Sequence, residues 1–135
     1  MVRIDLVYEG NLRCRLTHGP SGRALETDAP KDNQGKGESF SPTDLLASAL
    51  GSCMMTVMGI YARKHGLPLD GSTLEITKEM AADPRRVSRL TLNFRMAAGI
   101  GVSHRAALEK AALTCPVALS LHPGVETPAR FDYPD

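Results

Sequence analysis

The feature that most constrains the fold is one long apolar stretch, SPTDLLASALGSCMMTVMGIYARKHG, at residues 41–66. Ser41 suits a helix N-cap, Pro42 suits the first helical position, and Asp44 resembles the acidic member of a capping box. Gly66, just before a Leu-Pro step, suits the end of the helix. A helix whose apolar residues cover most of its circumference is buried on several sides. We therefore expect a central helix that is wrapped by sheet or packed against a second subunit.

The middle of this predicted helix carries Gly51, Ser52 and Cys53. A glycine in a helix interior costs roughly 1 kcal/mol relative to alanine, so its presence needs a reason. Gly51 and Ser52 thin the helix beside the thiol. They therefore predict the close approach of another backbone, a partner helix or a ligand.

The N-terminal third has the patterns of strands and turns. Period-two alternation predicts strands over residues 2–8 and 12–18, with a shorter one at 23–27, and the turn signals between them favour an antiparallel meander. Residues 28–39 hold no apolar run and many turn formers. A loop of this length is either a functional lid or mobile segment, or a solvated connector.

The C-terminal half predicts a second hairpin followed by helices. The hairpin covers residues 73–80 and 86–96. Its predicted inward face is Leu90, Leu92, Phe94 and Met96. Ser103 is expected to cap a helix that ends at Thr114-Cys115-Pro116, where Pro116 opens a short new helix. A final strand is expected within residues 124–135.

Length and composition favour one cytosolic domain over residues 1–135. A net charge of +1 and 4% aromatic residues argue against a nucleic-acid partner. The chain lacks both a run of about 20 uncharged apolar residues and the pattern of a signal peptide, so neither a membrane span nor secretion is expected.

The three cysteines cannot all pair with one another, so a structural disulfide framework is not expected. Cys53 is either a small core residue or a reactive thiol that must borrow a positive charge, because a helix interior lies beyond the reach of the macrodipole. Cys115 lies where the amides of a new helix are unpaired, which predicts the more acidic thiol; alternatively, it fills the joint between two helices. Cys14 alternates onto the apolar face of its strand and is predicted to be core.

The sequence gives no sign of a metal or cofactor site. The four histidines lie next to turns or helix ends and lack the short spacing of zinc ligands. The segment GKGES, residues 35–39, lacks the pattern of a phosphate-binding loop. We expect neither a metal nor a cofactor.

The run FSPTDLLASALGSCMMTVM and the later TCPVALSL resemble the OsmC/Ohr family. The resemblance implies an α+β fold in which antiparallel sheets wrap around long central helices in an intertwined homodimer. It also implies thiol-dependent reduction of organic hydroperoxides or hydrogen peroxide. The Cys53 thiolate would attack the peroxide, Cys115 would then form a disulfide with Cys53, and an external dithiol would restore the enzyme.

Two positions depart from the family pattern. The better-known peroxidases activate the attacking thiolate with a glutamate where this chain has Thr43, and with an arginine where it has Pro20. The resemblance is therefore to the broader OsmC-like group rather than to the organic-hydroperoxide specialists. The candidate activating residues, by chemistry alone, are Arg23, Arg15 and Asp44, with Glu38 as a further acid.

Two other functions are compatible with the same residues. One is a non-catalytic binding module that holds a small apolar ligand at the dimer interface. The other is a redox sensor with negligible turnover.

Overall fold

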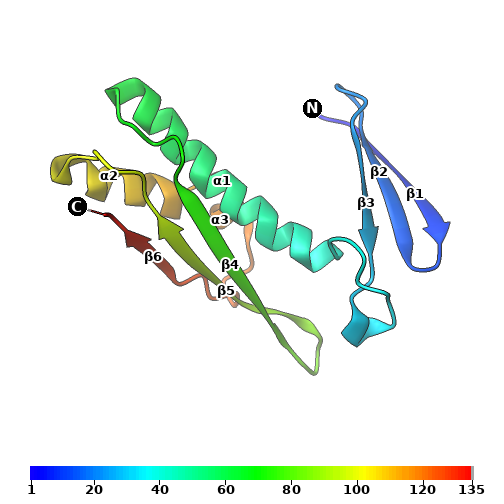
Figure 1. Ribbon diagram of the computed structural model, residues 1–135. Helices are drawn as coiled ribbons and strands as arrows, with labels where there is room; N and C mark the ends of the chain where they lie inside the picture. The colour runs from blue at the N-terminus through cyan, green and yellow to red at the C-terminus, as the bar shows by residue number, and fades with distance from the viewer. Residues whose placement is uncertain (135) are drawn as a thin grey trace. The chain divides into compact units, whose positions relative to one another are not determined.

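The computed structural model describes residues 1–134 and has an α+β fold (Figure 1). The chain divides into two compact units, Met1–Leu46 and Ala47–Asp135, which are described separately below. The single domain over residues 1–135 stays a prediction.

The first unit contains the predicted meander. Its strands are β1 (Ile4–Gly10), β2 (Arg13–His18) and β3 (Ala24–Asp28), paired antiparallel in the order β1-β2-β3. The β1–β2 turn uses Asn11 and Leu12 at φ 55° and 62°, and two successive positive φ values give the turn that matches strand twist.

One face of this sheet is apolar and exposed. Leu6, Leu16 and Leu25 lie in register across the three strands. Leu6 and Tyr8 keep 59% and 61% of their surface exposed. Cys14 lies opposite Tyr8 and is half-buried, so the prediction that it belongs to the core was wrong for the single chain. An exposed apolar patch of this kind is typical of an interaction surface.

The loop that follows β3 is closed and internally hydrogen-bonded. The Asp28 N–H donates to the Phe40 carbonyl at 3.1 Å and ties the two ends together. Inside, the Gly35 N–H donates to Pro30 O at 3.0 Å, and a Cβ at Gly35 would collide with the Ala29 backbone. This network favours a fixed connector over a mobile lid. The one helical turn in it is a 3-10 turn, η1 (Lys31–Asn33).

The predicted central helix is α1 (Pro42–His65). The Asp44 carboxylate accepts from the Ser41 N–H at 2.9 Å, and the Ser41 hydroxyl accepts from the Asp44 N–H at 3.1 Å. This reciprocal pair is the predicted capping box. Gly66 follows the helix at φ 65°, a backbone conformation that suits glycine.

Within the part of the chain that the structure describes, α1 is long and apolar enough to cross a membrane by length and composition. The core helix of a globular protein passes the same test, and α1 has a fully buried face, formed by Ala47, Leu50, Gly51, Met54, Met58 and Ala62. We assign it to the core.

The second unit packs α1 against a three-stranded sheet. The strands are β4 (Thr73–Ala81), β5 (Arg86–Arg95) and β6 (Ala129–Asp132), in the order β4-β5-β6. β4 and β5 form the predicted hairpin, but β6 runs parallel to β5. The sheet is therefore mixed, and the prediction of purely antiparallel sheets was wrong. The final strand was predicted correctly, although Asp135 lies outside the described residues.

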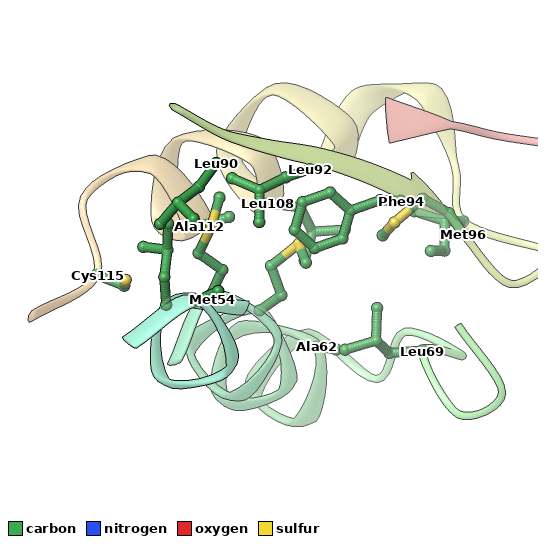
Figure 2. Packing of buried hydrophobic residues seen from close by; sticks show 14 of the residues in the cluster. Met54, Ala62, Leu69, Leu90, Leu92, Phe94, Met96, Leu108, Ala112 and Cys115 are labelled. Atoms are coloured by element: carbon green, nitrogen blue, oxygen red, sulfur yellow. The ribbon is translucent and has the colours of Figure 1, made fainter. Parts of the chain in front are cut away.

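The predicted inward face of β5 forms the centre of the core. Leu90, Leu92 and Phe94 have no exposed surface, and Met96 keeps 4%. Figure 2 shows these side chains in one cluster with Met54 of α1 and Leu108 of α2 (Val102–Leu113), with Met96 at the end away from Met54. Phe94 also stacks on Phe131 of β6, with ring centroids 4.5 Å apart. The core therefore joins the first and last elements of the unit.

The two C-terminal helices differ in their N-caps. The N-cap of α2 is Gly101 and makes no side-chain cap bond, so the prediction of a cap at Ser103 was wrong. α3 (Pro116–Ser120) begins at the predicted proline, with Cys115 as its N-cap.

Candidate active site

Gly51 of α1 packs against two side chains of β4. A Cβ at this position would collide with Ile76 and would lie 2.8 Å from Leu74 Cδ2. The glycine thus admits two side chains of the sheet. Since residues two apart in a helix point about 200° away from each other, this contact is on the far side of α1 from Cys53. The expectation that Gly51 thins the helix beside the thiol was therefore wrong.

Cys115 is fixed at the joint between α2 and α3. Its exposed fraction is 1%, and its sulfur accepts a hydrogen bond from the Ala118 N–H at 3.4 Å. Pro116 occupies the first helical position and has no N–H to compete for the sulfur. Figure 2 shows Cys115 at one end of the hydrophobic cluster.

Burial raises the pKa of the Cys115 thiol above its ordinary value of 9.0. The Ala118 and Val117 amides lower the pKa, as the position at a helix start predicts, but loss of hydration of the charged form outweighs them. The expectation that the helix start lowers the pKa of Cys115 was wrong for this reason. Which of the two thiols is the more acidic stays a prediction. Cys115 is a protonated, buried thiol at neutral pH.

The structure brings Cys53 and Cys115 together. Cys53 is half-buried and packs against the core cluster to which Cys115 belongs. A side-chain hydrogen bond with Cys53 and the charge of Cys53 both contribute to the raised pKa of Cys115. Both thiols therefore belong to one hydrophobic cluster, with the half-buried Cys53 on α1 and the buried Cys115 at the start of α3.

The three residues predicted to activate the Cys53 thiolate lie in the first unit. Arg15 on β2 pairs with Glu26 at 3.5 Å, with about half of each side chain exposed. Arg23 is exposed in the turn before β3, where its N–H donates to the Ser21 hydroxyl at 3.3 Å. Asp44 caps α1, which accounts for its place in the sequence.

An ion-pair cluster at the base of the loop was missed by the sequence analysis. Arg13 Nη2 lies 2.7 Å from Glu38 Oε1 and 3.6 Å from Asp28 Oδ2. Asp28 is 2% exposed and accepts from the Glu38 N–H at 3.0 Å. The cluster borders a small cavity of about 170 Å³. The pairing register of β2 and β3 could have revealed this cluster, because it places Arg13 opposite Asp28.

The arrangement of the cluster explains the position of Glu38. A buried carboxylate is costly without a nearby charge and hydrogen bonds, and Asp28 has both from Arg13 and the loop backbone. We interpret the cluster as a clamp that holds the loop on the sheet. Glu38 is therefore part of this clamp.

The histidines of α1 and α2 form an aromatic contact. The Tyr61 hydroxyl lies 3.0 Å from His104 Nδ1, and the rings of His65 and His104 are 5.3 Å apart. Among residues 1–134, no group of three or more histidine, cysteine or acidic side chains is placed to hold a metal ion.

The chain is similar to known families and structures. A family model for OsmC-like proteins matches residues 35–128. A crystal structure from Psychrobacter arcticus 273-4, of a proposed osmotic stress induced and detoxification response protein, is 45% identical over 98% of this chain and 96% of that one, with a TM-score of 0.93. No curated protein sequence matches the chain.

More distant structures share the fold. The organic hydroperoxide resistance protein OsmC of Legionella pneumophila is 15% identical over 98% of this chain and 96% of that one, with a TM-score of 0.77. An organic hydroperoxide resistance protein of Elizabethkingia anophelis is 13% identical over the same shares of the two chains, with a TM-score of 0.76.

Proposed function

Because this chain belongs to the OsmC-like family, we propose that it is a thiol-dependent peroxidase that reduces organic hydroperoxides or hydrogen peroxide. The observation that carries the proposal is the pair of free thiols, half-buried Cys53 and buried Cys115, in one hydrophobic cluster. Two free thiols of unequal accessibility in one cluster suit a two-step redox cycle. Distant relatives named as organic hydroperoxide resistance proteins support the same substrate class.

In the first step, the Cys53 thiolate attacks the terminal oxygen of the hydroperoxide. A sulfur–oxygen bond forms, the oxygen–oxygen bond breaks, and the leaving alkoxide takes a proton from water to become the alcohol. Cys53 is thereby oxidised to a sulfenic acid. Cys53 is assigned to this step because its sulfur is the more accessible of the two.

In the second step, Cys115 attacks the sulfenic sulfur and releases water, which leaves a Cys53–Cys115 disulfide. An external dithiol then reduces this disulfide by thiol–disulfide exchange, and Cys53 is the sulfur that it can reach. A cytoplasmic location suits the cycle because that compartment supplies dithiol reductants.

The assembly proposed for this function is an intertwined homodimer. The apolar face of β1–β2–β3 supports it, since exposed apolar side chains such as Ile4, Leu6 and Leu25 favour burial against a second copy. Light scattering after gel filtration tests the assembly. The expected mass is twice that of the chain, and a concentration-independent monomer would contradict it.

Steady-state consumption of cumene hydroperoxide with dithiothreitol tests the activity. Cys53→Ser is expected to abolish turnover, and Cys115→Ser to reduce it strongly because the sulfenic acid is no longer resolved internally. Cys14→Ser is the matched control and is expected to keep full turnover. A wild-type protein that consumes no peroxide, or a Cys53→Ser variant as active as wild type, would reject the proposal.

A further inference from the structure

We propose that the outer face of the second sheet binds a zwitterionic dipeptide, whose carboxylate pairs with Arg95 and whose ammonium group pairs with Glu75. The outer face is the face of β4, β5 and β6 that is turned away from α1, the helix that carries Cys53. All residues of the site belong to the second unit. The site takes no part in the cysteine chemistry and does not depend on the proposed function.

Alternation along the strands defines this outer face. Leu74 and Ile76 of β4 lie against Gly51 of α1, and Phe94 of β5 stacks on Phe131 of β6 within the core. Successive side chains of a strand point to opposite faces of the sheet, so the neighbours of these residues lie on the outer face. They are Thr73, Glu75, Asn93, Arg95, Arg130 and Asp132.

A groove of about 420 Å³ lies among these outer side chains. This volume falls within the range of small-molecule pockets. The strand register arranges the side chains in two rows across the sheet, which are Thr73–Arg95–Asp132 and Glu75–Asn93–Arg130. The lining is therefore almost wholly polar, which suits a small charged ligand rather than an apolar one.

Two opposite charges in the groove have no partner. Arg130 Nε donates to Asp132 Oδ1 at 2.9 Å, so these two side chains pair with each other. Within residues 1–134, the side chains of Arg95 and Glu75 form no hydrogen bond and no ion pair. The two residues are diagonal neighbours on adjacent strands, a position at which residues lie about 7–8 Å apart. The groove thus presents one unpaired cation and one unpaired anion side by side.

Elsewhere the outer face pairs its charges. Arg89 of β5 lies directly opposite Glu79 of β4, with 4.0 Å between Arg89 Nε and Glu79 Oε2. Its Nη2 also lies 2.7 Å from Glu126 Oε2. Arginine and glutamate therefore do form ion pairs on this face where the register places them opposite each other. The diagonal offset of Arg95 from Glu75 leaves both charges for a ligand.

A ligand with a carboxylate at one end and an ammonium group at the other satisfies both charges at once. A simple anion would be repelled by Glu75, and a simple cation would be repelled by Arg95. The planar guanidinium of Arg95 suits a carboxylate, and the Asn93 amide and the Thr73 hydroxyl offer further hydrogen bonds. The charged ends of an extended dipeptide lie about 6 Å apart, close to the diagonal spacing, whereas those of a single amino acid lie closer together.

Titration of isotope-labelled protein with glycylglycine, followed by heteronuclear NMR at low salt, tests the site. Saturable shifts are expected for the amides of residues 73–75, 93–95 and 130–132. The expected Kd is millimolar, because both charge pairs are exposed to solvent. N-acetylglycylglycine lacks the ammonium group and glycylglycine amide lacks the carboxylate. Each is expected to bind about fivefold more weakly than glycylglycine.

Arg95→Gln and Glu75→Gln each remove one charge but keep a polar side chain. Each is expected to weaken the binding of glycylglycine about fivefold. Arg89→Gln is the matched control, because it removes an arginine from the same strand and the same face outside the groove, and it is expected to leave the Kd unchanged. The spectrum of each variant reports whether it is folded, and if one groove variant does not fold, the other decides.

Three outcomes would overturn the inference. In the first, glycylglycine causes no saturable shift at these residues. In the second, Arg89→Gln weakens binding as much as the groove variants do, which would indicate a general effect of charge. In the third, N-acetylglycylglycine or glycylglycine amide binds as tightly as glycylglycine, which would mean that the groove does not recognise both ends of a zwitterion.

Discussion

Gly51→Ala distinguishes helix propensity from packing at the centre of α1. Propensity alone predicts that alanine stabilises the helix by about 1 kcal/mol. The structure predicts the opposite, because the new methyl would collide with Ile76 and lie 2.8 Å from Leu74 Cδ2. Overpacking of this kind costs about 1–3 kcal/mol. The expected net change is therefore a loss of stability of about 1 kcal/mol.

Ile76→Val supplies the control because it removes the Cδ1 methyl that the new Cβ meets first. Alone, this change costs about 0.5–1.5 kcal/mol. In the Ile76→Val background, Gly51→Ala is expected to be close to neutral, which gives a favourable coupling of about 1 kcal/mol. Urea unfolding followed by circular dichroism, at one fixed protein concentration, measures all four proteins. Stabilisation by about 1 kcal/mol in both backgrounds would refute the packing argument.

Three further predictions address the cap, the loop and the buried thiol. Ser41→Ala removes one half of the capping box and is expected to lower the free energy of unfolding by about 1 kcal/mol, measured by urea unfolding; no change would contradict the cap. Gly35→Ala forces a Cβ into the Ala29 backbone, so amide hydrogen exchange within residues 29–40 is expected to accelerate. Unchanged protection from exchange would mean that this contact does not fix the loop. Since burial raises the pKa of Cys115, the rate of disulfide formation from the Cys53 sulfenic acid is expected to rise steadily with pH from pH 6 to 8 in stopped-flow fluorescence. A rate that levels off by pH 7 would show that Cys115 is already ionised there.

Features with a local physical cause could be predicted from the sequence. The capping box depends on Ser41 and Asp44, three residues apart, so their side chains and amides meet once the first turn forms. The inward face of β5 follows from alternation, and Phe94 is buried as that alternation predicts. The start of α3 at Pro116 was also predicted, because proline suits the first position of a helix.

Features with a non-local cause could not be predicted. The reason for Gly51 lies on β4, in side chains that the sequence does not place beside it. The acidity of Cys115 was misjudged because the local amides were visible in the sequence while the burial that outweighs them is a property of the whole core. The parallel pairing of β6 with β5 joins segments more than thirty residues apart and leaves no local signal.

The central claim is that Cys53 and Cys115 form a redox pair, and one titration tests it most directly. Fully reduced protein receives one equivalent of cumene hydroperoxide without reductant, and the disulfides are mapped by mass spectrometry of unreduced peptides. The account predicts one equivalent of peroxide consumed and a single Cys53–Cys115 linkage within one chain. Peroxide left unconsumed, or a disulfide that uses Cys14 in place of either residue, would contradict it.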